Sequence, residues 1–363
     1  MEQKRLGDLA TYINGYAFKP EDRGKEGLPI IRIQDLTGNT YDLGFYNGDY
    51  PEKIEINDGD ILISWSASLG VYIWNRGKAL LNQHIFKVVF DKEEVNKQYF
   101  VFAVKYNLKE MGTKAHGATM KHIVKKDFDN TLVPFPTIEK QDVIAEILSK
   151  AAYIVDARKQ ELQKLDDLVR ARFVELFGDE NNSKNWSIVH IEDVVDVQVG
   201  VVIKPSQYYT DESNGIKAFR SLNVGAGFIK DSDWVYFTAE GHQKNSKSIL
   251  RENDLLIVRS GAPGTACVVT EDYVGCNAID IIIAHPDCEK VNPYYLCTFT
   301  NMPHGKKQIV EGTGGAAQQH FNVGKYNKLQ LMLPPKELQD KFVEFINQIA
   351  KSKFTKTFGP LRC

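Results

Sequence analysis

Basic, hydroxyl and amide side chains gather in two glycine-containing stretches of this 363-residue chain. The residues concerned are Lys114, His116, Thr119 and Lys121 in the first stretch, and Lys306, Lys307, Gln318 and Gln319 in and before the second. Ammonium groups neutralise phosphates, and hydroxyl and amide groups hydrogen-bond to phosphate oxygens or base edges. These residue types predict exposed loops that bind nucleic acid. The alternative for each lysine is an ordinary solvated surface charge.

Further candidates for DNA contact come within or at the end of short apolar runs. They are Ser64, Trp65 and Ser66 after one run, Arg259 and Ser260 after a second, and Arg32 and Arg220 inside two more. Arg259 has the donors for a bidentate pair with guanine, whereas Trp65 is equally well explained as a core residue. Arg32 and Arg220 occupy matching places, which indicates either a structural ion pair or a phosphate contact.

The composition is typical of a soluble globular protein, with 43% hydrophobic and 25% charged residues. The net charge of -2 gives no global sign of a nucleic-acid partner, so such a site must come from local patches. The five cysteines form no C-x-x-C pair, which favours reduced thiols in a cytoplasm over disulfides or a zinc site. We expect no membrane span, no signal peptide and no bound metal.

A catalytic protein is one alternative class. Asn292–Tyr295 reads Asn-Pro-Tyr-Tyr, which is similar to the Asn-Pro-Pro-Tyr motif of adenine methyltransferases except at the third position. Its counterpart in the first half is Asn96-Lys-Gln-Tyr99, so the motif is better explained as a helix cap with proline in the first turn. The sequence also contains no Walker motif and no glycine-rich loop that opens a βαβ unit. We therefore do not expect the chain to be a self-contained methyltransferase.

An internal repeat determines the predicted architecture. The halves open with similar segments at Leu6 and Ile191, and further landmarks follow in the same order. These pairs are Arg32 and Arg220, Asp60 and Asp254, Gly70 and Gly264, Asn82 and Asn277, His122 and His320, Pro136 and Pro334, and Gln141 and Gln339. Chance explains one such match but not the ordered set. The chain therefore contains two related globular units.

A long helix is predicted from Glu139 to Phe177, because neither proline nor glycine interrupts this stretch and Gly178 follows it. Apolar residues recur every seven positions, at Leu148, Val155, Leu162, Val169 and Leu176. A heptad stripe requires a helical partner or a docked subunit to cover it. The alternative is a long solvated surface helix. A second helix is expected from Lys336, and Gly359-Pro360 should break it, so it is shorter than the first.

Short β-branched runs bounded by turn residues predict strands inside each unit. We expect strands at Ile61–Ser64, Ile85–Phe90, Leu255–Val258 and Ala278–Ala284, and helices at Gln98–Glu110 and Tyr294–Asn301. The fold class is therefore α+β, with two β-rich domains at 1–137 and 187–333. The central helix occupies 138–178, a linker 179–186, and a shortened distal helix 334–363.

The doubled arrangement resembles the specificity subunits of type I restriction-modification systems. The junctions Pro136–Gln141 and Pro334–Gln339 match that family's passage from a recognition domain into a helix. The helix end Glu175–Asp179, followed by Trp186 before the second domain, is also similar. The resemblance extends from about Leu6 to Phe354, and the last residues depart from the pattern.

The resemblance implies a non-catalytic, cytoplasmic subunit whose two target-recognition domains each read half of a bipartite double-stranded DNA target. The helices would form an antiparallel coiled coil that sets the spacing. Two methyltransferase subunits would dock on it, at the stripe from Leu148 to Leu176, and motor-nuclease subunits would join them. The chain would bind no cofactor, while its partners use S-adenosylmethionine, ATP and magnesium. A coiled-coil adaptor without DNA binding, and a truncated inactive subunit, remain as alternatives.

Overall fold

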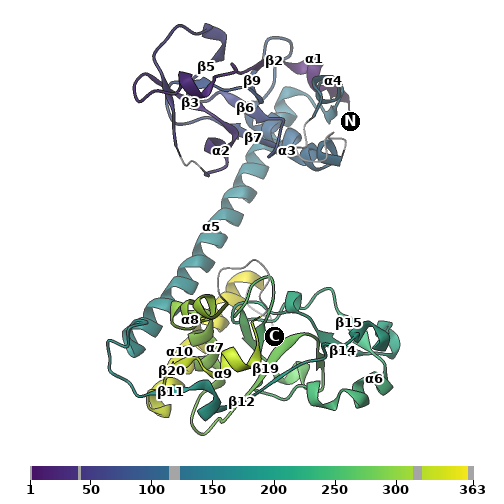
Figure 1. Cartoon of the computed structure of the whole chain (residues 1–363). Helices are drawn as coiled ribbons and strands as arrows, with labels where there is room; N and C mark the ends of the chain where they lie inside the picture. The colour runs from purple at the N-terminus through teal and green to yellow at the C-terminus, as the bar shows by residue number, and fades with distance from the viewer. Residues whose placement is uncertain (1, 40–41, 114–122, 314–320, 359–363) are drawn as a thin grey trace. The chain divides into compact units, whose positions relative to one another are not determined.

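The computed structural model describes residues 2–39, 42–113, 123–313 and 321–358 (Figure 1). The chain forms two compact units, Met1–Arg158 and Lys159–Cys363. The division between them falls inside the long helix α5, Ile138–Phe177. No helix in the described ranges combines the length and the apolar character needed to cross a membrane.

The first unit contains two four-stranded sheets, with the orders β2-β9-β6-β7 and β4-β3-β8-β5, and the pair β1-β10. Its strands are β1 Gln3–Arg5, β2 Thr11–Asn14, β3 Leu28–Ile31, β4 Phe45–Tyr46, β5 Glu55–Ile56, β6 Ile61–Ser64, β7 Gly70–Ile73, β8 Ala79–Leu81, β9 Ile85–Val89 and β10 Leu132–Pro134. The helices that precede α5 are α1 Leu6–Leu9, α2 Ile33–Leu36, α3 Lys97–Thr113 and α4 Lys125–Asp129. Strand β6 is central and buried along its whole length, as its apolar sequence predicts.

The second unit repeats this topology, with the orders β12-β19-β16-β17 and β13-β15-β14-β18 and the pair β11-β20. Its strands are β11 Ile188–His190, β12 Val195–Val199, β13 Tyr209–Thr210, β14 Ile216–Phe219, β15 Val235–Phe237, β16 Leu255–Val258, β17 Ala266–Val268, β18 Asn277–Ala278, β19 Ile281–Pro286 and β20 Gln330–Met332. Its helices are α6 Ala239–Lys244, α7 Pro293–Asn301, α8 Pro303–Thr313, α9 Val323–Asn327 and α10 Lys336–Phe358. The parallel pairs β3-β8 and β14-β18 also correspond, so the repeat in the sequence is a repeat of fold.

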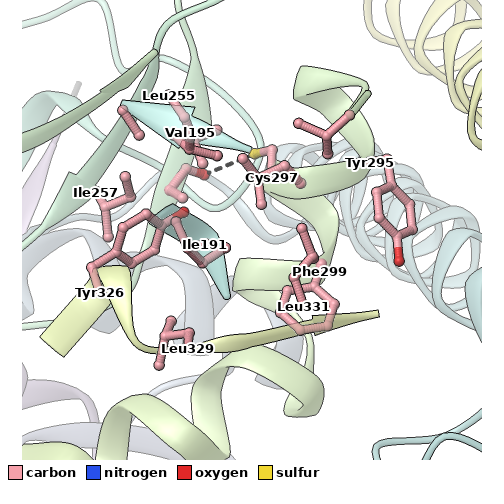
Figure 2. Packing of buried hydrophobic residues seen from close by; sticks show 14 of the residues in the cluster. Ile191, Val195, Leu255, Ile257, Tyr295, Cys297, Phe299, Tyr326, Leu329 and Leu331 are labelled. Atoms are coloured by element: carbon pink, nitrogen blue, oxygen red, sulfur yellow. Dashed lines mark hydrogen bonds between the residues drawn. The ribbon is translucent and has the colours of Figure 1, made fainter. Parts of the chain in front are cut away.

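The main core of the second unit lies between the sheet and helix α7 (Figure 2). Tyr295, Leu296 and Phe299 of α7 are fully or almost fully buried. The Cys297 thiol donates a hydrogen bond to the carbonyl of Ala266, 3.4 Å away on β17, shown dashed in the figure. This packing makes α7 an integral part of the unit.

Helix α10 packs antiparallel to the C-terminal part of α5 within the second unit. The buried ring of Phe342 lies 5.4 Å from Phe173 and 5.5 Å from Phe177, measured between ring centroids. Further along α10, the Lys353 ammonium pairs with Asp166. Because residue numbers rise on one helix as they fall on the other, the two helices run in opposite directions. The predicted antiparallel helical pairing is confirmed for this part of α5.

Most of the predicted elements are confirmed, and one strand prediction is wrong. Helix α5 begins one residue before the predicted Glu139, and Gly178 ends it with a φ of +89°. The stretch Ala278–Ala284 is not one strand, because Asp280 has a φ of +48° and separates β18 from β19. The break expected at Gly359-Pro360 lies outside the described residues.

Candidate nucleic-acid interface

In the first unit, the loop between β6 and β7 carries Trp65. Its ring stacks on Phe86 at 5.7 Å between centroids and meets the edge of His84 at 4.9 Å. The indole N–H donates to Oδ1 of Asn14 at 3.2 Å. Trp65 is therefore half-buried, with contacts to the end of β2 and the start of β9, and both predicted interpretations describe part of its surroundings.

In the second unit, Arg259 occupies the equivalent place after β16. Its guanidinium pairs with the carboxylate of Asp280, and its Nε donates to the carbonyl of Phe321 at 3.2 Å. Asp280 and His84 are themselves equivalent, since each has a positive φ and directly precedes strand β19 or β9. One unit thus has an aromatic pair where the other has an ion pair.

The backbone at this position makes an equivalent hydrogen bond in both units. The backbone carbonyl of Trp65 accepts a hydrogen bond from the N–H of Ile123 at 2.9 Å. The carbonyl of Arg259 accepts one from the N–H of Phe321 at 3.2 Å. Ile123 and Phe321, the first described residues after residues 114–122 and 314–320, therefore lie beside this loop in their own units. In both units, a residue far along the chain is thus held at the loop that follows the central strand.

The serines of these loops differ in accessibility. Ser64 and Ser66 are buried, and the Ser64 hydroxyl donates to the carbonyl of Ser68 at 2.5 Å. Both serines therefore lie in the interior of the loop in the described structure. Ser260 is half-buried and lines a pocket of about 350 Å³, together with Lys230 and Thr265. The second unit thus has a hollow beside Arg259.

Arg32 and Arg220 are turned toward their own units. Arg32 forms an ion pair with the buried Asp35 at 3.4 Å, and its guanidinium also donates to the carbonyl of Asp42. Arg220 donates from its backbone N–H to Asn223, which replaces the aspartate, and from its guanidinium to the carbonyl of Asp233. Of the two predicted roles, the structural ion pair describes Arg32. In the described structure Arg220 binds carbonyl and amide oxygens instead.

The basic residues of α8 divide between surface and interior. Lys307 is exposed. Lys306 is half-buried and donates to the carbonyl of Pro263 at 3.2 Å, and burial lowers its pKa. His304, which the sequence groups with these lysines, is buried and contacts the carbonyl of Gly178 at 3.0 Å. His304 therefore does not belong to a basic surface, because α8 turns this side against Phe173 and Phe299.

Six predicted DNA-contacting residues lie outside the described residues. They are Lys114, His116, Thr119, Lys121, Gln318 and Gln319. The sequence did not single out Asn14, His84 or Asp280. For His84 and Asp280 a signal was available in the repeat, because each is a polar residue directly before the equivalent strand β9 or β19.

The heptad stripe of α5 is covered along part of its length. Leu148 and Val155 are 39% and 51% exposed. Leu162 is half-buried, while Val169 and Leu176 pack against the core of the second unit. The stripe therefore changes from an intramolecular contact near the C-terminal end of α5 to an open apolar surface near its N-terminal end.

Two copies of one β-rich fold, each with a polar loop after its central strand and each leading into a helix, define a two-unit recognition protein. The chain belongs to the family whose model is described as the type I restriction modification DNA specificity domain, which matches residues 1–166 and 183–357. It therefore has a DNA sequence-specificity role, as a non-catalytic component of a type I restriction-modification complex. The adaptor without DNA binding is not favoured.

The relatives support this placement. The chain is 24% identical to the type I restriction enzyme EcoBI specificity subunit of Escherichia coli, over 95% of this chain and 78% of that protein. It is also 24% identical to the MjaVIII specificity subunit of Methanocaldococcus jannaschii, over 70% of this chain and 63% of that protein. The crystal structure of the S subunit from M. genitalium has the same fold, with a TM-score of 0.56 at 14% identity, covering 98% of this chain and 91% of that one.

Proposed function

We propose that each unit reads one half of a bipartite double-stranded DNA target, and that the helices set the distance between the halves. In this proposal the loops after β6 and β16, together with residues 114–122 and 314–320, would form the reading surface of each unit. Basic side chains of these segments, and the exposed Lys307 of α8, would contact phosphates, while hydroxyl and amide groups would meet base edges.

The observation that carries this proposal is the different chemistry at one shared position. Trp65 with His84 and Arg259 with Asp280 occupy the same place on the same fold. Framework residues at such a place would be expected to agree, whereas residues beside a reading loop differ if each unit selects its own sequence. The two half-sites should therefore differ.

The open part of the α5 stripe is the proposed docking surface for methyltransferase subunits. Ile147, Leu148, Ile154 and Val155 are between 39% and 60% exposed. Exposed apolar residues in a contiguous stripe mark interaction surfaces. Two methyltransferase subunits would bind S-adenosylmethionine, and motor-nuclease subunits would use ATP and magnesium. The chain would bind no cofactor itself and would act in the cytoplasm.

A unit exchange tests the proposal. Residues 187–330 are replaced by the equivalent unit of another family member, and the chain is expressed with its methyltransferase partner. A map of methylated motifs should show one half-site changed and the other retained. A change in both half-sites would contradict the assignment of one half-site to each unit.

Binding of the purified chain to duplex DNA provides the second arm. Affinity should fall steeply with salt, because each neutralised phosphate releases counterions. Lys307→Ala should reduce that salt dependence without changing the preferred sequence. An affinity that depended on neither the salt concentration nor the DNA sequence would count against the proposed reading surface.

A further inference from the structure

A buried glutamine stands at the start of each connecting helix. In the first unit, Gln141 of α5 has no exposed surface. Its Oε1 accepts from the backbone N–H of Asn96 at 3.1 Å, and its Nε2 donates to the carbonyl of Pro136 at 2.9 Å. The amide thus joins the first turn of α5 to the start of α3 and to the segment between β10 and α5.

The neighbouring residue extends this connection. Nδ2 of Asn96 donates to the carboxylate of Asp142 at 2.7 Å, while Oδ1 of Asn96 accepts from the N–H of Tyr99 at 2.9 Å and caps α3. Asn96 therefore holds two helices at once. We call Gln141, Asp142 and Asn96 the helix latch of the first unit.

The second unit has the same latch, made of Gln339, Asp340 and Asn292. Oε1 of Gln339 accepts from the N–H of Asn292 at 2.8 Å, and Nε2 donates to the carbonyl of Pro334 at 2.8 Å. Nδ2 of Asn292 donates to Asp340 at 2.8 Å, and its Oδ1 caps α7 through the N–H of Tyr294. Gln339 is also fully buried.

We propose that the two latches fix the directions of α5 and α10 relative to the β-rich domains that precede them, and thereby limit the spacer lengths that the chain accepts. Gln141 and Gln339 are positioning residues in this proposal, which rests on the proposed reading of a bipartite target. A glutamine suits the place because one side chain supplies both an acceptor for an N–H and a donor for a carbonyl. An apolar side chain would leave both backbone groups buried and unpaired.

The length of α5 makes its direction matter. From Gln141 to Phe177 the helix extends by roughly 54 Å at about 1.5 Å per residue. A tilt of about 5° at the latch would move the far end by roughly 5 Å, which exceeds the rise of about 3.4 Å per base pair. A loose latch would therefore admit targets with altered spacers, even when both reading surfaces are intact.

Gln141→Met tests the proposal, because it keeps an unbranched side chain of similar size and removes both hydrogen bonds. Gln163→Met on the same helix is the matched control, since Gln163 is exposed and donates to Asp167 one turn away. Exchange of the Asn96 amide, followed by mass spectrometry, should accelerate roughly tenfold in the first variant, the factor expected for loss of about one buried hydrogen bond. The Asn292 amide of the second unit should be unchanged and serves as an internal reference.

Two further measurements separate positioning from simple stability. Spin labels at the exposed positions Lys53 and Lys150, in a chain with Cys288 and Cys363 replaced by serine, report the direction of α5 relative to its own unit. The distance distribution should broaden in Gln141→Met and stay narrow in Gln163→Met. Methylation mapping should show targets with one base pair more or fewer in the spacer for Gln141→Met, with the half-site bases unchanged.

A variant with a lower melting temperature, a narrow distance distribution and unchanged spacer selection would overturn the proposal. If Gln141→Met does not fold, Asp142→Ala removes the exposed partner of Asn96 and leaves the buried amide in place, with the same outcomes expected at smaller size. The exchange and distance measurements need no DNA. Unchanged amide exchange and an unchanged distance distribution in Gln141→Met would refute the role of the latch. A native chain that selects no bipartite target would instead refute the proposed function.

Discussion

Lengthening α5 by one heptad should lengthen the spacer of the DNA target. A second copy of Gln160–Asp166 placed directly before the first keeps the phase of the heptad stripe. The copy next to Asp167 still supplies Asp166 to the ion pair with Lys353. The helix grows by about 10 Å at roughly 1.5 Å per residue. At about 3.4 Å per base pair, this accommodates up to roughly three more base pairs.

The helical rotation of α5 and of the DNA determines how much of the added length of α5 appears as extra base pairs in the spacer. A heptad falls about 20° short of two full helical turns, so the units turn little relative to the helix. Three base pairs of DNA turn by roughly 100°, given about 10 to 10.5 base pairs per turn. The DNA or the helices must absorb the difference, so we expect a lengthening of one to about three base pairs.

Methylated motifs from cells that carry the insertion would reveal the change. The half-site bases should remain the same, because the loops are untouched. A duplication of Gln160–Lys164 is the matched control: it adds about 7.5 Å but rotates one end by about 140° beyond a full turn, so it should abolish methylation. Altered half-site bases with the original spacing would refute the hypothesis that the length of α5 sets the spacer. Equal behaviour of the two insertions would show that helical phase plays no part.

Two further predictions concern the second unit. Phe342→Ala removes a fully buried ring and should lower the free energy of unfolding by about 3–5 kcal/mol; urea titration should show a smaller loss for the half-buried Phe345→Ala, and equal losses would contradict the packing. Although burial alone would raise it, hydrogen bonds from Lys336 and Asn292 hold the pKa of Asp340 below its usual 3.8. The resulting stability is present above pH 3.8 and is lost as the pH falls through the lowered pKa, so Asp340→Asn should flatten the acid limb of the stability curve.

Local sequence patterns were sufficient to predict the helices and strands that depend mainly on interactions between residues close in sequence. Helix α5 follows from an uninterrupted amphipathic run ended by Gly178, and strands β6 and β16 follow from short apolar runs between turn residues. The cap of α7 by Asn292 was also predictable, because the asparagine and the following proline act within one turn. These features depend on neighbours in sequence, which a single chain displays directly.

Long-range pairing explains what the sequence did not reveal. Asp280 breaks a β-branched run at a residue whose side chain pairs with Arg259, which lies far from it in sequence. His304 stands close to Lys306 and Lys307 in the sequence, but it is buried and its partner is the carbonyl of Gly178, directly after α5. The order of the repeat predicted that such positions correspond. It did not predict which groups meet there.

Comparison of the two units within one chain separates framework from recognition. Gln141 and Gln339 have the same partners, and each is buried, so their agreement follows from one structural requirement met twice. The backbone carbonyls of Trp65 and Arg259 accept equivalent hydrogen bonds, each within its own unit, but one side chain is aromatic and the other is charged. A position whose backbone role is fixed and whose side chain varies can change sequence preference without changing the fold. The loops after β6 and β16 meet that condition, and the latches do not. Substitutions in the loops should therefore change the half-site bases, whereas substitutions in the latches should change the accepted spacer length.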